Sequence, residues 1–261
     1  MKEESLLNNY PHRHLLGIEG LSPNSINYLL KLSEEFVEYL NKNNNEKLDY
    51  LKNKTCINLF FENSTRTRTS FELAGKKLGA DILNISVGSS SIKKGETLID
   101  TAMTLNAMQA DLIVVRHNDA GAVKLLSEKV NCGVINAGDG RHEHPTQALL
   151  DIVSLKEKFG YIKNLKIGII GDISHSRVAL SNIFGLKTLG AKVTLCGPST
   201  LMPLKIEELG LSVNNNIDEV IEWADAINVL RIQRERMNNA LIPSVREYRR
   251  LFGITQSRIE K

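Results

Sequence analysis

Short apolar runs alternate with longer segments of helical periodicity along most of the chain. The runs are CINLFF (56–61), LIVV (112–115), VIN (134–136), KIGII (166–170), KVTLC (192–196) and AINVL (226–230). Each run is apolar at consecutive positions, so both of its faces are expected to be buried, as in parallel strands that are covered by helices. The pattern therefore predicts an α/β fold with parallel sheets.

The segments between the runs carry apolar residues at helical spacing. A first helix is expected after Ser22, which suits the N-cap, and Pro23, which suits the first helical position. Further helices are predicted at roughly 65–78, 96–109, 119–129, 145–158, 177–189 and 217–224. The helix at 145–159 has strand-helix alternation on both sides, so it is expected to join two domains.

These elements together predict two Rossmann-like three-layer αβα domains with parallel sheets, joined by the long helix. We place the domains at 1–146 and 147–261. In open α/β sheets, ligands bind beyond the carboxyl ends of the strands, so the active site is expected in the crevice between the domains.

Composition narrows the class of protein. The 261 residues suffice for one large domain or two small ones, at roughly 150 residues per domain. Hydrophobic residues at 42% and charged residues at 24% are usual for a soluble globular protein. No apolar run approaches the ~18 residues of a membrane span, and the first residues do not form a secretory signal, so a cytoplasmic location is expected. The net charge of +3 is too small to indicate a protein that binds nucleic acid or a membrane surface.

Polar residues follow nearly every apolar run. They are ENSTRTRTS (62–70), Arg116 with His117, AGDGRHEHPTQ (137–147), GDISHSR (171–177) and RIQRER (231–236). Because arginine, histidine and hydroxyl groups recur at these strand ends, the sequence predicts a ligand of negative charge.

The segment Ser64-Thr65-Arg66-Thr67-Arg68 links a predicted strand to a predicted helix. The N-terminus of a helix bears a partial positive charge and unpaired N–H groups, which suit a phosphate. Arginine adds donors that can bind a phosphate in a bidentate manner. A plain Ser/Thr N-cap with two solvated arginines is an equally simple interpretation of these residues alone.

Longer motifs favour the phosphate-site interpretation over the plain N-cap interpretation. FENSTRTRTSFE (61–72) resembles the carbamoyl-phosphate signature of the aspartate/ornithine carbamoyltransferase family, and NAGDGRHEHPTQALLD (136–151) resembles the His-Pro-x-Gln signature of the same family. The resemblance continues in the same order from HLLGIEGLS (14–22) to RIQRERM (231–237).

Two segments distinguish the branches of that family. Ser90-Ser91-Ile92-Lys93-Lys94-Gly95-Glu96 is similar to the lysine loop of the aspartate enzymes. RIQRER (231–236) is similar to their aspartate-binding segment, where ornithine enzymes carry a Ser-Met-Gly loop. The resemblance therefore favours aspartate as the acceptor substrate and disfavours ornithine.

The resemblance implies transfer of the carbamoyl group of carbamoyl phosphate to the α-amine of L-aspartate, in pyrimidine biosynthesis. It makes 1–146 the carbamoyl-phosphate-binding domain and 147–261 the aspartate-binding domain. The residues that it assigns to carbamoyl phosphate are Ser64, Thr65, Arg66, Thr67, Arg116, His144, Gln147, Ser90 and Lys94, of which Arg66, Thr67, Arg116 and His144 are catalytic. The residues that it assigns to aspartate are Lys94, Arg177, Arg231 and Gln233.

Ser90 and Lys94 reach the site of a neighbouring subunit in this family, so the resemblance implies a homotrimer with shared active sites. It leaves open whether a regulatory chain binds as well. No cofactor is expected, because GIIGDISHSR (168–177) lacks the G-x-G-x-x-G fingerprint of a dinucleotide site. No metal is expected either, because no Cys/His cluster at ligand spacing accompanies His142 and His144.

Members of the family continue for several dozen residues past the position of Lys261, through a further strand, a His-Pro-x-Pro loop and C-terminal helices. We therefore expect that the aspartate-binding domain is incomplete and that this chain alone is weakly active and marginally stable. A truncation is the favoured interpretation; a natural fragment and a non-catalytic anion-binding protein stay open as alternatives.

Overall fold

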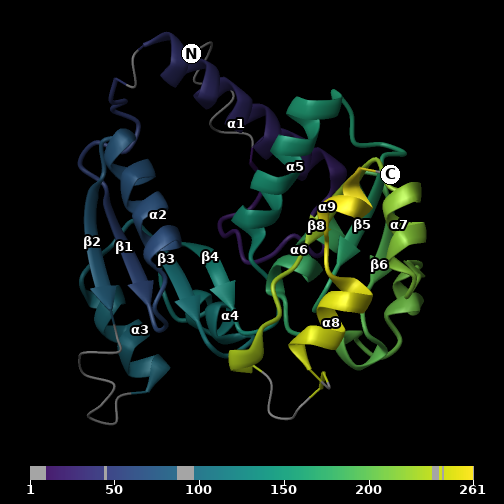
Figure 1. The fold of residues 1–261 in the computed structure, drawn as a ribbon. Helices are drawn as coiled ribbons and strands as arrows, with labels where there is room; N and C mark the ends of the chain where they lie inside the picture. Colours follow the sequence, from purple (N-terminus) through teal and green to yellow (C-terminus); the bar gives the residue numbers. More distant parts are fainter. Residues whose placement is uncertain (1–9, 44–45, 87–96, 237–240, 243, 261) are drawn as a thin grey trace. The chain divides into compact units, whose positions relative to one another are not determined.

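A computed structural model describes residues 10–43, 46–86, 97–236, 241–242 and 244–260. The chain divides into two compact units, Met1–Val153 and Ser154–Lys261. This division falls inside helix α5 (Pro145–Phe159), whereas the sequence pattern places it at 146/147. Figure 1 shows the sheets of both units with the helices that accompany them.

The first unit is built on a parallel four-stranded sheet in the order β2-β1-β3-β4. Its elements are α1 (Pro23–Lys42), β1 (Thr55–Phe60), α2 (Thr65–Lys77), β2 (Asp81–Ser86), α3 (Leu98–Ala107), β3 (Leu112–His117), α4 (Ala122–Ser127) and β4 (Gly133–Asp139), followed by α5. The predicted cap of the first helix is confirmed, because the Ser22 side chain accepts a hydrogen bond from the amide of Ser25.

Helices cover both faces of this sheet. Strand side chains alternate between the two faces, so each face forms its own buried cluster with its helices. One cluster of buried residues joins the strands to α3 and α4 and includes Ile57, Leu59, Ile113, Val115, Leu105 and Val123. A second cluster lies on alternate strand positions, Cys56, Phe60 and Val114, and takes in Phe71 of α2. The first unit is therefore a three-layer αβα arrangement.

The free edge of β4 is covered by the segment that precedes α1. The Leu15 amide donates to the carbonyl of Val134 at 2.9 Å, and the Asn136 amide donates to the carbonyl of Leu15 at 2.9 Å. Leu15 and Ile135 thereby form an isolated parallel bridge. These bonds satisfy the edge of the sheet at the strand that leads into the loop before α5.

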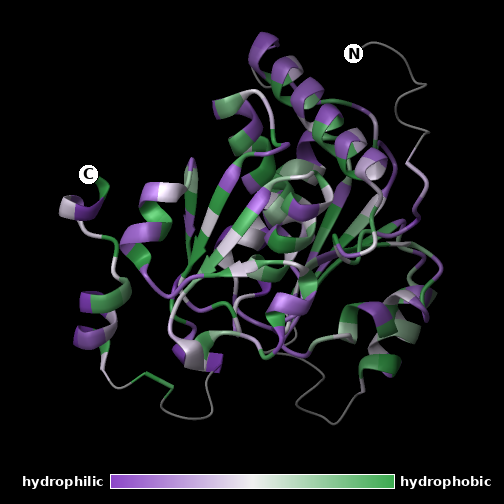
Figure 2. Ribbon diagram, turned by 90° about the vertical axis from the view of Figure 1, so that its right-hand side faces the viewer, coloured by the Kyte–Doolittle hydropathy of each residue, from purple (hydrophilic) through white to green (hydrophobic). Residues whose placement is uncertain are grey.

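The second unit carries another parallel four-stranded sheet, in the order β7-β6-β5-β8. Its α-helices and strands are β5 (Lys166–Ile170), α6 (Arg177–Thr188), β6 (Lys192–Cys196), β7 (Ser212–Val213), α7 (Ile217–Trp223), β8 (Ala226–Val229), α8 (Val245–Phe252) and α9 (Gln256–Ile259). Among the described residues of this unit, short 3-10 helices lie at Ser199–Leu201, Ile206–Leu209 and Arg234–Arg236. In Figure 2 hydrophobic residues are concentrated in the strands, whereas the helices alternate between hydrophobic and hydrophilic stretches.

Helices α7 and α8 pack on the sheet of the second unit through apolar side chains. The cluster contains Ile170, Cys196, Ile217 and Val220, with Ile227 and Phe252 packed against it. A Cβ atom at Gly168 would lie 2.9 Å from the Val220 side chain, so glycine permits the close approach of α7 to β5. Within the described ranges, none of the helices combines the length and the apolar content needed to cross a bilayer.

The predicted strands and helices are confirmed, and β2, β7, α8 and α9 are additions. Strand β2 is an edge strand with four of its positions exposed, so its sequence DILNIS lacks the continuous apolar run of a buried strand. Helix α8 buries only the Tyr248 and Phe252 side of a segment that is rich in arginine, which hid its periodicity. Cys56, Cys132 and Cys196 are buried free thiols, and burial raises the pKa of Cys56 and of Cys196 to about 11.

Gly171, directly after β5, provides a test of the fold. Its φ of +129° is a conformation that L-residues avoid, and a Cβ atom there would lie 2.8 Å from the Leu230 carbonyl oxygen. We expect Gly171→Ala to lower the free energy of unfolding by about 1–3 kcal/mol. Gly160→Ala is the control, because Gly160 also has a positive φ but no atom lies within 4 Å of its added Cβ. Equal losses in urea unfolding of the two variants would contradict the role of the close contact.

Candidate active site

The predicted phosphate segment lies at the N-terminus of α2, directly after β1. Ser64 occupies the N-cap position, but its side chain makes no capping hydrogen bond. The capping bond that a plain Ser/Thr N-cap would make is therefore absent, although Ser64 keeps the N-cap position. Thr65 and Arg66 are exposed, and no hydrogen bond or ion pair of the Arg66 side chain occurs among the described residues.

Arg116 links this segment to two neighbouring strand ends. It lies on β3 opposite Phe60 of β1, and its Nη1 donates to the Thr67 hydroxyl at 3.2 Å and to the Ala137 carbonyl at 3.3 Å. Its Nε donates to Glu62 Oε1 at 2.5 Å. The structure thus brings the predicted residues Thr67 and Arg116 together at the carboxyl edge of the sheet.

His144 and Gln147 lie at the start of α5, after the loop that follows β4. The His144 side chain is buried, its Nδ1 lies 3.4 Å from the Thr146 hydroxyl, and its carbonyl accepts the amides of Gln147 and Ala148. Gln147 Nε2 donates to Asp151 Oδ1 at 2.9 Å. Both predicted residues are therefore held by bonds within the first turns of the helix.

Asp139, a residue that sequence reasoning did not select, organises the loop before His144. Its carboxylate accepts from the Asn136 side chain at 2.9 Å and from the amides of Gly121 and Glu143 at 3.0 and 3.1 Å. Burial alone would raise the pKa of Asp139, but these bonds and one from His142 outweigh it and lower the pKa. Asp139 is therefore a buried anion that fixes the loop.

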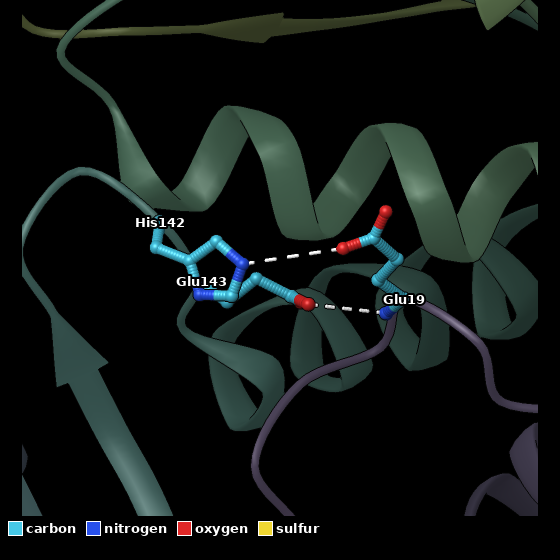
Figure 3. A group of neighbouring side chains, drawn as sticks. All are labelled: Glu19, His142 and Glu143. Carbon is cyan, nitrogen blue, oxygen red and sulfur yellow. Dashed lines mark hydrogen bonds and ion pairs between the residues drawn. The ribbon is translucent and has the colours of Figure 1, made fainter. Parts of the chain in front are cut away.

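Glu143 ties the same loop to the segment before α1, as Figure 3 shows. Its Oε2 accepts from the amide of Ile18 at 2.7 Å, and its Oε1 accepts from the amide of Glu19 at 3.1 Å. His142 Nε2 lies 4.0 Å from Glu19 Oε2. The buried Glu143 was not predicted either, although a carboxylic acid between two histidines is a visible signal.

Glu19, His142 and Glu143 each offer a ligand atom, and these atoms lie within 4.8 Å of one another. Both oxygens of Glu143 already accept backbone amides, and His142 Nδ1 lies 3.3 Å from the Asp139 carboxylate. The group is satisfied as a hydrogen-bonded network of protein atoms, so we assign it a structural role.

In the second unit, the predicted residues Arg231 and Gln233 follow β8, and Arg177 is the first residue of α6. Arg231 Nη2 donates to Gln233 Oε1 at 3.1 Å. Arg177 is buried, whereas Arg231 is exposed. The predicted residues Ser90 and Lys94 lie outside the described residues.

Asp172 anchors the segment that carries Arg231 and Gln233. This fully buried carboxylate accepts from the Gln233 amide at 3.1 Å and from His175 Nδ1 at 2.7 Å. Arg236 Nη1 closes the arrangement by donating to the His175 carbonyl at 2.9 Å. The position of Asp172, two residues after the end of β5, was the available signal for it.

Comparison with known proteins places these two sites in context. Residues 13–157 match the family model described as the carbamoyl-P binding domain of aspartate/ornithine carbamoyltransferase. The aspartate carbamoyltransferase catalytic subunit of Bradyrhizobium diazoefficiens is 58% identical over 248 residues, which cover 95% of this chain and 78% of that protein. The corresponding subunit of Rhizorhabdus wittichii is 55% identical over 252 residues, covering 97% of this chain and 79% of that protein.

Solved structures of aspartate transcarbamoylases are also similar to this chain. The aspartate transcarbamoylase of Trypanosoma cruzi in complex with carbamoyl aspartate and phosphate has a TM-score of 0.86 at 30% identity, covering 95% of this chain and 80% of that one. The catalytic subunit of M. jannaschii aspartate transcarbamoylase has a TM-score of 0.80 at 34% identity, covering 92% of this chain and 79% of that one.

The His142–Asp139 bond predicts a pH dependence of stability. This hydrogen bond is the main cause that raises the pKa of His142 above its ordinary value. The stabilisation is complete below the unfolded pKa of about 6.5 and is lost as the pH rises through the higher folded pKa. Between about pH 6 and 9, we expect the urea midpoint of the wild type to fall more than that of His142→Gln. Parallel curves for the two proteins would contradict this assignment.

Proposed function

This chain belongs to the aspartate/ornithine carbamoyltransferase family, and we propose that it transfers the carbamoyl group of carbamoyl phosphate to the α-amine of L-aspartate. The products are N-carbamoyl-L-aspartate and phosphate. The observation that carries the proposal is the bond of Arg116 to Thr67 at the N-terminus of α2, which combines cationic donors with a helix N-terminus.

The phosphate group of carbamoyl phosphate is assigned to Ser64, Thr65, Arg66 and Thr67. The first amides of α2 have no partners within the helix, and the helix dipole favours an anion at this end. The uncapped Ser64 hydroxyl and the exposed Arg66 guanidinium leave donors available for the phosphate oxygens.

The carbonyl oxygen of the carbamoyl group is assigned to Thr67, Arg116 and His144, and its amide to Gln147. The aspartate amine attacks the carbonyl carbon, negative charge grows on the carbonyl oxygen, and the bond to the phosphate oxygen breaks. The departing phosphate accepts the proton of the amine. Donors that are held in place before the reaction stabilise the growing charge without reorganisation. The three bonds of Arg116 supply that rigidity here.

Aspartate is assigned to Arg177, Arg231 and Gln233 in the second unit, together with Lys94. Guanidinium groups bind carboxylates through paired hydrogen bonds, so two arginines suit the two carboxylates of aspartate. Asp172 supports this assignment, because its bond to the Gln233 amide orders the segment before a substrate arrives.

A homotrimer with shared sites, to which Ser90 and Lys94 contribute, is the proposed assembly. The proposal rests on the resemblance of residues 90–96 to the lysine loop of the aspartate enzymes, which reaches the site of a neighbouring subunit in that family.

Replacement of His144 tests the role of the carbonyl donors. We expect His144→Ala to lower kcat by about 10²–10³, the usual effect of losing one such donor. The matched control is His12→Ala, which removes an exposed histidine of the same unit. The measurement is the rate of carbamoyl-aspartate formation by the purified chain; equal rates for the two variants would exclude His144 from the chemistry.

Binding measurements test the carbamoyl phosphate assignment and the aspartate assignment separately. Arg66→Ala should weaken carbamoyl phosphate by about tenfold or more in calorimetry, because a charged hydrogen-bond donor is lost. Arg231→Ala should leave carbamoyl phosphate affinity unchanged and weaken a bisubstrate phosphonate that joins carbamoyl phosphate to aspartate. Intact carbamoyl phosphate affinity in Arg66→Ala would overturn the phosphate assignment. A wild type that gains no affinity from the aspartate half would instead be a non-catalytic anion-binding protein.

A further inference from the structure

A second cationic site lies in the second unit, in a pocket of about 520 Å³ formed by α7, α8 and α9. The residues that line it are Asp218, Arg246, Arg249, Arg250, Thr255, Ser257 and Arg258. The pocket is widely open to solvent, so the case for a ligand rests on the charges of the residues that line it. None of these residues belongs to the proposed carbamoyl phosphate or aspartate sites.

Helix α8 is oriented by its apolar side, which directs a row of arginines away from the sheet. Phe252 packs against the core cluster of the second unit, and Tyr248, four residues earlier, is half-buried. Burial raises the pKa of Tyr248 to about 12. Arg246, Arg249 and Arg250 are all exposed and, at spacings of three and four residues, share a face of the helix.

The charges of the pocket do not balance. Among the described residues that line it, the only acid is Asp218, which is paired with Arg258, whose Nε lies 3.3 Å from Asp218 Oδ1. Arg258 also donates to the carbonyls of Gly253 and Arg250, so its side chain is held in place between α7, α8 and α9. For the side chains of Arg246, Arg249 and Arg250, no acidic partner occurs in the part of the chain that the structure describes.

The helix dipole explains two of these arginines and not the third. Arg249 and Arg250 lie in the last turn of α8, where cations are favourable, but Arg246 lies in the first turn, where they are not. Like charges at these spacings also repel one another. Glu247, in the same first turn and three residues before Arg250, offsets part of both costs, and an anion bound between the three guanidinium groups would relieve the rest.

We propose that the pocket formed by α7, α8 and α9 binds a small anion with two or more phosphate groups. Four arginines and one aspartate leave a formal charge of 4 − 1 = +3, which matches a di- or triphosphate better than a monophosphate. Guanidinium groups bind phosphate oxygens in pairs, and the Thr255 and Ser257 hydroxyls, 3.0 Å apart, add neutral donors.

The test is calorimetric titration of the purified chain with tripolyphosphate at fixed ionic strength. Arg246→Gln combined with Arg250→Gln should weaken binding by at least about tenfold, because two charged donors are lost. Lys124→Gln combined with Lys129→Gln, which removes two charges from the first unit, is the matched control and should have little effect. Equal weakening in the two double variants would overturn the proposal, because binding would then follow net charge alone.

Three further arms make the result specific. Arg66→Ala should keep tripolyphosphate binding, which separates this site from the proposed carbamoyl phosphate site; loss of binding there would overturn the proposal. Citrate should bind more weakly than tripolyphosphate if phosphate is the recognised group, and tighter citrate binding would overturn that choice. A nucleoside triphosphate that binds no more tightly than tripolyphosphate identifies the phosphates alone as the ligand, whereas tighter binding identifies a nucleotide.

If the double variant fails to fold by circular dichroism, Arg250→Lys replaces it. This change keeps the charge and removes the fork of donors, so a weaker loss of several-fold is expected. An unchanged affinity in Arg250→Lys together with an unchanged affinity in Arg246→Gln would also overturn the site.

Discussion

The half-buried guanidinium of Arg116 is the interaction on which the first unit's site depends. A charge removed from water must be compensated by hydrogen bonds, and Arg116 finds them at Glu62, Thr67 and Ala137. These partners lie at the ends of β1 and β4 and in the first turn of α2. Satisfying one side chain therefore holds the connection from β1 to α2, which carries proposed carbamoyl phosphate donors, against β3 and β4.

Buried carboxylates perform the same task in both units. Asp139 accepts hydrogen bonds from the backbone amides of Gly121 and Glu143, and Asp172 accepts them from the backbone amides of His175 and Gln233. In each case the acid follows or ends a strand, and the residues that it orders include or adjoin proposed ligand-binding side chains. Arrangements of this kind hold donors in place before substrate arrives, which is the condition for strong electrostatic stabilisation of a transition state.

The strands and helices with continuous apolar patterns could be predicted from the sequence, and so could the strand ends that bear the site. Strand β2 could not, because an edge strand with one exposed face lacks the apolar run of a central strand. The motif residues Thr67, Arg116 and His144 were identifiable from their types and spacing. Asp139, Glu143 and Asp172 carried only the weak signal of an acid at a strand end or beside the histidines, because the contacts that make them important join different segments, and a single sequence contains no record of those contacts.

The bond between Glu143 and the amides of Ile18 and Glu19 joins positions 125 and 124 residues apart. Bringing such distant segments together costs loop-closure entropy, which is recovered only when most of the intervening chain is already ordered. The segment before α1 is made first on the ribosome, whereas the acid that accepts its amides is made 124 to 125 residues later. Its position beside β4 therefore requires residues from both ends of the first unit to be present.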